Sequence, residues 1–329
     1  MVRGSTAQLR GLSYVALTAA IAQIVFGAIV RISGSGMGCG NHWPKCYGRW
    51  FPPFDQPTLV IEWTHRLIAA LLLVALAALT AAAFAMRDTA GVGGRGGVLR
   101  ASTLALLMWP AQALLGAITV WLGNIWYATA GHWLLAATLL AALAAAVMRA
   151  GGLGGEAARR ERASPRTARG AVAGASIALI TILFGGLTAT YPGANVACQG
   201  FPLCQGSGVG LTGEHIQITH RILALLLVLH VFGLLFGVAR RREAPVVARA
   251  VGVAAGLLVL QVGVAATMIE LHLPAAVRSL HQAIGVLIWL TLFSVAYLAR
   301  MASRGVASTA SAAADAVRRP LAPSPEAGR

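Results

Sequence analysis

The sequence has few charged residues for its length, and this scarcity excludes an ordinary soluble protein. Only 11% of its 329 residues are Asp, Glu, Lys or Arg, whereas 57% are hydrophobic. Soluble globular domains carry about 25% charged residues. Residues 67–84 contain no charge at all, and about 20 apolar residues suffice for a helix to cross the hydrocarbon core of a bilayer. The composition therefore predicts an integral membrane protein.

Apolar runs of this length recur eight times and fall into two sets of four. The expected spans are 13–32, 59–86, 101–123, 128–148, 170–190, 213–239, 250–269 and 276–299. We expect an all-α fold of eight transmembrane helices, arranged as two four-helix bundles in a parallel repeat. The N-terminal bundle is expected at 1–150, a cytoplasmic linker at 151–169, the C-terminal bundle at 170–304 and a disordered cytoplasmic tail at 305–329.

Acidic residues are scarcer still, with 10 Asp and Glu against 26 Lys and Arg, so the net charge is +16. Such a charge is compatible with nucleic-acid binding, but its distribution favours membrane orientation instead. Most basic residues lie at the two termini and in every second connection between spans. Lys and Arg accumulate in short cytoplasmic loops, so both termini are expected in the cytoplasm. The first apolar run continues into Arg31 without a signal-peptide cleavage site, and a bacterial plasma membrane is the expected location.

The two halves of the chain repeat the same histidine pattern. A Thr-His-Arg triplet surrounds His65 in the second span and His220 in the sixth. A further histidine opens the fourth span and the eighth, at His132 and His281. Ionisable residues inside spans are costly and are candidates for function. Two imidazoles that face each other across a four-helix bundle suit the two axial positions of a haem iron, so each bundle is predicted to hold one haem.

Several alternatives to ligation stay open at this point. A histidine near the membrane surface is often only a polar residue at a wet boundary. Small residues near the same level make room for a flat macrocycle or simply let helices pack closely; they are Gly27, Gly116, Gly185 and Gly263. The other four histidines are interpreted as non-ligands: His42, His215, His230 and His272. Zinc is a poor alternative, because no tight cluster of His and Cys has the spacing of a zinc site.

Only four cysteines are present, and they form two pairs in outer loops. Cys39 and Cys46 lie in the first outer loop, and Cys198 and Cys204 lie in the equivalent loop of the second half. The oxidising outer compartment permits disulfides. Such a pair can clip a small loop, cycle between dithiol and disulfide or bind copper.

Glu62 stands three residues before His65, and positions i and i+3 share a face of a helix. The equivalent residue before His220 is Gln217, so one half has a carboxylate where the other has an amide. If one half performs chemistry, we expect it to be the half with Glu62; the alternative is a solvent-exposed interfacial carboxylate. Arg66 and Arg221 follow the histidines and are expected to pair with haem propionates or to anchor the helices at the interface.

The order and duplication of these motifs resemble the haem A synthase family. The motifs are Gly34 to Cys39, Trp43 to Cys46, Glu62 to Arg66, Gly131-His132, Thr219 to Arg221 and His281. The resemblance covers about residues 12–300 and implies an oxidoreductase that converts the ring-8 methyl of haem O to a formyl group by successive hydroxylations. It implies that His65 and His132 hold the substrate haem O, that His220 and His281 hold a haem b, and that Glu62 is needed for the chemistry. Cys39 and Cys46 are implied to matter for electron handling or for the active loop.

The resemblance also implies partners and leaves competing functions to be tested. Haem O synthase is the implied upstream partner, cytochrome oxidase assembly factors are further candidates, and the sequence identifies no electron partner. A di-haem b electron-transfer protein without catalysis predicts the same four ligands but leaves the contrast between Glu62 and Gln217 unexplained. A transporter predicts polar residues at the middle of the membrane, whereas here they lie near the outer ends of the spans.

Overall fold

The computed structural model describes residues 5–206 and 211–318, and this part of the chain is almost entirely helical. Within it, eight helices are long and apolar enough to cross a membrane, which confirms the predicted number. They are α1 (Thr6–Ile32), α2 (Pro57–Ala85), α3 (Val98–Trp121), α4 (Trp126–Arg149), α6 (Pro165–Thr190), α7 (Leu211–Arg241), α8 (Pro245–Glu270) and α9 (Ala275–Arg318). The short elements are η1 (Ser35–Met37), α5 (Gly155–Arg160), η2 (Ala194–Val196) and the paired strands β1 (Cys198–Gln199) and β2 (Gln205–Gly206).

Local signals in the sequence set where several helices begin. The side chains of Ser5 and Ser164 accept hydrogen bonds from the backbone N–H groups of Gln8 and Thr167, and so cap α1 and α6. Prolines stand in the first turn of α2, α6 and α8, where the missing N–H has no partner within the helix anyway. The positions of these helices therefore follow from serine caps and proline starts together with the apolar runs.

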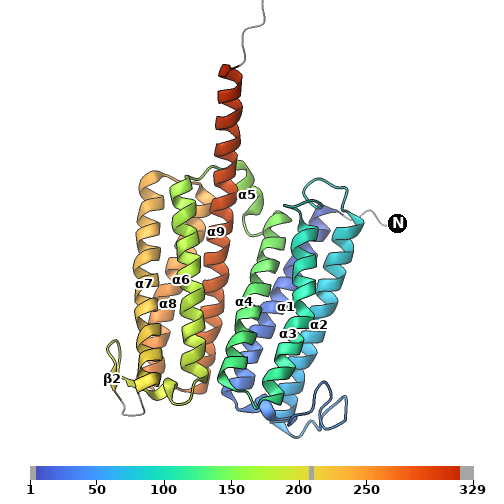
Figure 1. Cartoon of the computed structure of the whole chain (residues 1–329), viewed down its shortest axis with the longest axis vertical. Coiled ribbons are helices and arrows are strands. Elements are labelled where there is room, and N and C mark those ends of the chain that lie inside the picture. The colour runs from blue at the N-terminus through green and yellow to red at the C-terminus, as the bar shows by residue number, and fades with distance from the viewer. Residues whose placement is uncertain (1–4, 207–210, 319–329) are drawn as a thin grey trace, which may run out of the picture.

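The long helices form two groups of four that lie side by side (Figure 1). Helices α1 to α4 make up the first group and α6 to α9 the second, with α1 and α4 in contact with α6 and α9 across the boundary. The most apolar windows of α4 and α9 are 56% and 50% buried, against at most 33% for the other spans. Alanines dominate the buried face of α4, and small residues let membrane helices approach closely. The parallel repeat itself stays a prediction.

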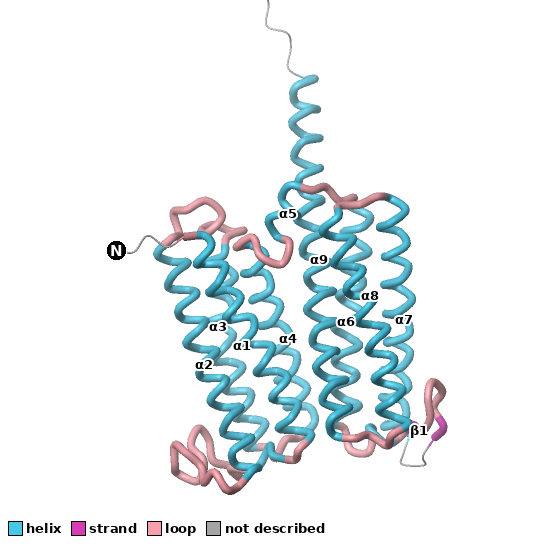
Figure 2. The backbone as a smooth tube through the Cα atoms, turned by 180° about the vertical axis from the view of Figure 1, so that it is seen from behind, coloured by secondary structure: helices cyan, strands magenta, loops and turns pink. Residues whose placement is uncertain are grey.

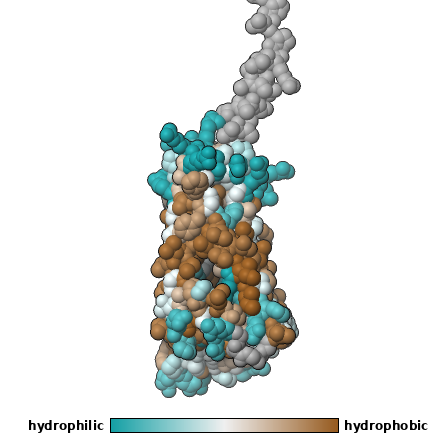
Figure 3. Space-filling model, turned by 90° about the vertical axis from the view of Figure 1, so that its left-hand side faces the viewer, coloured by the Kyte–Doolittle hydropathy of each residue, from teal (hydrophilic) through white to brown (hydrophobic). Residues whose placement is uncertain are grey.

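The two ends of the molecule carry different parts of the chain. Figure 2 shows the connection between α1 and α2 and the strands β1 and β2 at one end, and α5 with the extension of α9 at the other. A band of hydrophobic residues separates the hydrophilic ends (Figure 3). This distribution is the one expected when every long helix crosses a bilayer, and the protein is a multi-pass membrane protein.

Two segments differ from the sequence-based expectation. The linker at 151–169 contains helix α5, and α6 already begins within it at Pro165. Helix α9 continues through residues 305–318, where a disordered tail is predicted from composition. This stretch is rich in alanine, and alanine has the highest helix propensity of all residues. The alanines therefore favour a helix where the overall composition predicts disorder. Residues 319–329 lie outside the described part of the chain.

Glu243 joins two connections at the end opposite the cysteines. Its carboxylate accepts hydrogen bonds from the Ser164 backbone N–H and from the hydroxyls of Ser164 and Thr167, and it pairs with Arg241. Burial opposes ionisation, but the hydrogen bonds from Ser164, Thr167 and Arg241 outweigh it and lower the pKa of Glu243 to about 2. The carboxylate therefore fixes the start of α6 to the connection between α7 and α8.

Candidate functional site

His65 lies in α2 against a glutamine and a glycine of α1. The side-chain amide nitrogen of Gln23 is 3.2 Å from Nε2 of His65. One turn further along α1, a methyl group at Gly27 would lie 3.0 Å from Cε1 of the same ring. A larger side chain at Gly27 would therefore push the imidazole away, which gives this glycine a role at the ring itself.

His132 in α4 has the same surroundings, supplied by α3. The amide nitrogen of Gln112 lies 3.2 Å from Nε2 of His132 and 3.1 Å from its backbone carbonyl oxygen. A methyl group at Gly116 would lie 3.1 Å from Cε1 of the ring. The first group of helices thus holds two imidazoles, each with a neighbouring helix that contributes an amide and then, four residues later, a glycine.

The second group repeats this arrangement with one change at each histidine. Gln261 of α8 lies 3.4 Å from Nε2 of His281 and donates to its carbonyl oxygen at 2.9 Å. At His220, the Thr181 carbonyl oxygen of α6 accepts from Nδ1 at 3.0 Å, and a methyl group at Gly185 would lie 2.9 Å from Cε1. A backbone carbonyl at Nδ1 fixes the tautomer and leaves Nε2 free to bind a metal.

Two of the four histidines lie in each group of helices, His65 and His132 in the first and His220 and His281 in the second. His65 and His132 lie close enough to interact electrostatically, and so do His220 and His281. The described residues contain no group of three or more His, Cys, Asp or Glu that could hold a metal ion. Two imidazoles are the number that the axial positions of a haem iron take, and ligation of a haem by each pair stays a prediction.

Several polar atoms around these rings are buried without a partner. They are Nδ1 of His65, His132 and His281, and Oε1 of Gln23, Gln112 and Gln261. A buried polar group without a hydrogen bond costs about 1–3 kcal/mol. Because unpartnered atoms of both kinds gather at three of the four histidines, these places fit a bound group that supplies the missing contacts.

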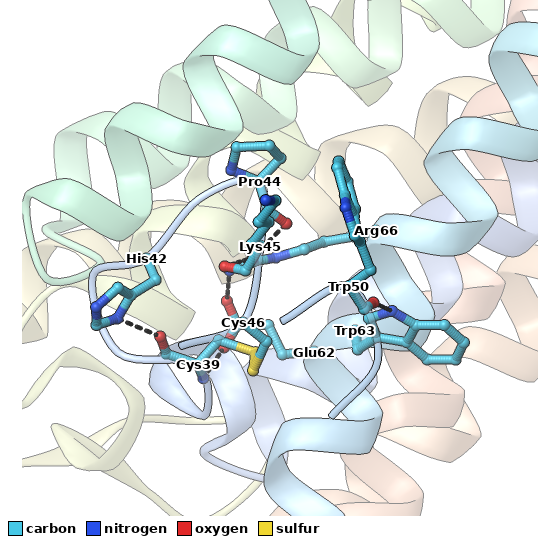
Figure 4. The surroundings of a disulfide bond; sticks show 9 residues. All are labelled: Cys39, His42, Pro44, Lys45, Cys46, Trp50, Glu62, Trp63 and Arg66. Atoms are coloured by element: carbon cyan, nitrogen blue, oxygen red, sulfur yellow. Dashed lines mark hydrogen bonds and ion pairs between the residues drawn. A yellow bond between two sulfur atoms is a disulfide. The ribbon is translucent and has the colours of Figure 1, made fainter. Parts of the chain in front are cut away.

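A disulfide-closed loop lies at the same end of each group. Bonds join Cys39 to Cys46 and Cys198 to Cys204, and these are the two predicted pairs. The backbone N–H of Cys39 donates to Oε2 of Glu62 at 2.8 Å, and that of Cys198 donates to Oε1 of Gln217 at 2.8 Å. Glu62 and Gln217 therefore occupy equivalent places, each accepting the amide of the first cysteine of its loop. Figure 4 shows Glu62 beside the Cys39–Cys46 disulfide.

The arginine after each histidine also holds its loop. Arg66 donates to the carbonyl oxygens of Pro44 and Lys45 at 3.0 and 3.1 Å. Arg221 donates to those of Gly200 and Pro202 at 2.9 and 3.0 Å. In the structure, both guanidinium groups hold the cysteine loops, a role that the sequence did not predict, and neither of the two expected roles is tested by these contacts.

Glu62 differs from Gln217 in its charge and in the ion pair that the charge permits. Its second oxygen, Oε1, pairs with the Arg66 guanidinium at 2.5 Å. The residue is only 3% exposed, so the interpretation of Glu62 as a solvent-exposed carboxylate is wrong. Both carboxylate oxygens are occupied by the loop and by Arg66, which makes the charge of this residue part of the structure that closes the site.

Labelling of thiols tests the oxidation state of the loops. We expect that the protein, unfolded in detergent without reductant, gives no labelled cysteine, and that all four cysteines label after reduction. Unfolding is required because Cys39 and Cys46 are buried. Cys39→Ser should expose Cys46 to labelling without reductant, and Cys198→Ser should do the same for Cys204. Labelling of Cys39 and Cys46 in unreduced wild-type protein would contradict the disulfide.

Four residues at the histidines were not identified from the sequence. They are Gln23, Gln112, Thr181 and Gln261. The repeat could have indicated two of them, because Gln112 and Gln261 each stand 20 residues before the histidine that they contact. Of the four glycines considered, Gly27, Gly116 and Gly185 lie against histidine rings, whereas Gly263 has no neighbour where a side chain would begin.

Comparison with known proteins gives one consistent family. The sequence model of the COX15-CtaA family, described as cytochrome oxidase assembly protein, matches residues 10–293. The heme A synthase of Bacillus pumilus (strain SAFR-032) is 30% identical over 241 residues, which cover 69% of this chain and 74% of that protein. The heme A synthase of Exiguobacterium sp. (strain ATCC BAA-1283 / AT1b) is 28% identical over 253 residues, which cover 75% of this chain and 78% of that protein. The heme A synthase of Geobacillus thermodenitrificans is 28% identical over 255 residues, which cover 72% of this chain and 75% of that protein. Because the family match covers most of the chain and includes all four paired histidines, this protein belongs to the COX15-CtaA family of cytochrome oxidase assembly proteins.

Proposed function

We propose that this protein is a haem A synthase, an oxidoreductase that converts the ring-8 methyl of haem O to a formyl group. The family match and the similar heme A synthases support the reaction. The observation that carries it to this chain is the presence of two pairs of half-buried imidazoles, three of which have buried polar atoms without a partner at or beside the ring. The residues present fit a haem at each pair, since each pair supplies two nitrogens and most of the rings lie against glycine.

We assign the substrate haem O to His65 and His132 and a resident haem b to His220 and His281. When bound, the resident haem would supply one-electron redox chemistry. The protein supplies the rest: imidazoles that fix each ring, helices that exclude water, and a loop that closes the outer end. Haem O also carries a long apolar tail, which the lipid-facing surfaces of the apolar helices can accommodate.

The assignment of the reacting haem to the first group rests on Glu62. A carboxylate can accept a proton released as the methyl is oxidised, whereas the amide of Gln217 cannot. Glu62 is buried beneath the cysteine loop. One of its carboxylate oxygens accepts a hydrogen bond from the Cys39 backbone N–H, and the other accepts one from the Arg66 guanidinium. We propose that Glu62 takes up this proton and that Arg66 and the loop hold the carboxylate in place.

We infer that the protein lies in the plasma membrane of a bacterium, with the cysteine loops outside and both termini in the cytoplasm. The arginine-rich connections at the end opposite the cysteine loops support this orientation, because positive charge accumulates in cytoplasmic loops. We propose haem O synthase as the upstream partner and other cytochrome oxidase assembly factors as further partners.

Haem extraction after co-expression with haem O synthase tests the function. We expect the purified protein to yield haem b together with haem O and haem A, identified by mass spectrometry. Without haem O synthase, it should yield haem b alone and no haem A. A di-haem electron-transfer protein would contain only haem b under both conditions, and that result would contradict the proposal.

A further inference from the structure

Arg31 lies at the outer end of α1, at the boundary between the two groups of helices. Its guanidinium reaches across this boundary to α6 and α9. One terminal nitrogen donates to the Ala189 carbonyl oxygen and the other to Oε1 of Gln282, each at 3.2 Å. Arg31 is therefore a residue of the first group whose charge lies on the second.

The neighbours of Arg31 in space are neighbours of the histidines in sequence. Gln282 follows His281 directly. The guanidinium carbon also lies 5.5 Å from the ring centre of Trp133, the residue after His132. Trp133 in turn packs so closely on α6 that a methyl group at Gly186 would lie 2.6 Å from its ring, and Gly185 is the glycine at His220. The charge of Arg31 thus lies beside the residue that follows one histidine of each pair, Trp133 after His132 and Gln282 after His281.

This charge has no anionic partner in the described part of the chain. Arg66, Arg160 and Arg241 each pair with a glutamate, but no described carboxylate pairs with Arg31. The charge that acts on it is another cation, Arg278 of α9. Its Nε atom is buried and has no hydrogen-bond partner. Leaving a charge unpaired away from water is unfavourable, so a site with two cations and a free donor is suited to an anion.

We propose that Arg31 binds a propionate carboxylate of the haem held by His220 and His281, and that it raises the reduction potential of this haem. The proposal rests on the assignment of a haem b to the second group. It is distinct from the earlier expectation for Arg66 and Arg221, whose guanidinium groups are occupied by the outer loops. Guanidinium and carboxylate make charge-assisted hydrogen bonds, and a cation beside a haem disfavours the oxidised, more positive state. Ala189 stands at the end of α6 as Arg31 stands at the end of α1, and it has no charge to offer the haem of its own group. The cation for this haem is therefore supplied by α1 of the first group.

Redox titration of haem b tests the proposal. We compare Arg31, Arg31→Gln and Arg31→Lys in a His65→Ala background, which is expected to retain only the haem of the second group. At a fixed ambient potential, Arg31→Gln should lower the ratio of reduced to oxidised haem by about tenfold, or about 59 mV for a one-electron couple. Arg31→Lys keeps the charge and should shift the ratio less. Arg10→Gln, on the same helix but about 30 Å away, is the matched control and should leave the potential unchanged.

A second measurement separates a contact with the carboxylate from a structural role. Apoprotein is titrated with haem b and with its dimethyl ester, which lacks the propionate charges. Wild type should bind haem b at least about tenfold more tightly than Arg31→Gln, and both should bind the ester equally. An unchanged potential in Arg31→Gln, or the same loss of affinity for haem b and for its ester, would overturn the proposal. Protein that binds no haem b in the second group would instead overturn the proposed function.

Discussion

Replacement of His65 or His132 by alanine should abolish formation of haem A and leave the haem b of the second group in place. Each imidazole is half-buried against a neighbouring helix, beside Gln23 and Gly27 for His65 and beside Gln112 and Gly116 for His132. Loss of residues that merely support a metal ligand costs about 10–100-fold in affinity or activity, so loss of the ligand itself should cost more than 100-fold. The measurement is haem extraction after co-expression with haem O synthase, together with the reduced-minus-oxidised spectrum of the purified protein.

The reciprocal variants provide the comparison. His220→Ala and His281→Ala should remove the low-spin bands of haem b, because their ligand pair is separate from the first. His215→Ala is a matched control, since His215 lies on α7 only five residues before His220 but is exposed, and it should retain both haems. Wild-type rates of haem A formation in His65→Ala would place the reacting haem elsewhere. Full retention of haem b in both His220→Ala and His281→Ala would contradict the second ligand pair.

The spans and the histidine pairs are predictable from the sequence because both depend on local patterns. An apolar run of about 20 residues in a membrane protein has essentially one outcome, since each backbone N–H and C=O must be satisfied within the helix. The histidines stand out because ionisable residues are rare inside spans and because their pattern occurs twice. The sequence therefore indicates which residues share a helix and which are repeated.

The contacts between helices are less predictable. Gln23 and His65 are 42 residues apart, and their contact depends on the relative rotation of α1 and α2, which a span prediction does not give. Arg31 looked like the end of an apolar run, yet its partners Ala189 and Gln282 are 158 and 251 residues away. Such contacts follow from packing between the two groups of helices, for which the sequence carries only the weak signal of small residues.

The direction of the Glu62 side chain shows the same limit. Helical spacing places Glu62 and His65 on one face, and from this the carboxylate is expected to share the cavity of the ring. The structure places the carboxylate against the Cys39 backbone N–H and Arg66. The cysteine loop folds back over the start of α2 and brings the backbone N–H of Cys39 to Glu62. A buried N–H requires an acceptor, and the carboxylate supplies it. The spacing was informative about the helix but not about the loop above it.

Glu62→Gln separates the two roles that this geometry permits. The amide keeps the shape of the side chain and can still accept the Cys39 N–H, as Gln217 accepts that of Cys198. Arg66 loses its ion pair but keeps the carbonyl oxygens of Pro44 and Lys45, just as Arg221 is held by carbonyl oxygens beside an amide. The variant should therefore fold, form both disulfides and bind haem at both sites.

If the charge of Glu62 serves only to hold the loop, conversion of haem O should continue near the wild-type rate, because the second group holds its loop with an amide. We expect instead that conversion stops or stalls at the hydroxylated intermediate. Removal of a proton from the reacting substrate needs a base, and general acid–base help of this kind is typically worth about 10²–10⁴-fold in rate. Mass spectrometry of the extracted haems separates haem O, the hydroxylated form and haem A.

Gln217→Glu is the matched control in the second group: it adds a carboxylate beside Arg221 and should leave product formation unchanged. Unchanged haem A formation in Glu62→Gln would reduce Glu62 to a residue that holds the loop, and the base would then have to be sought among groups that approach the substrate only when it is bound.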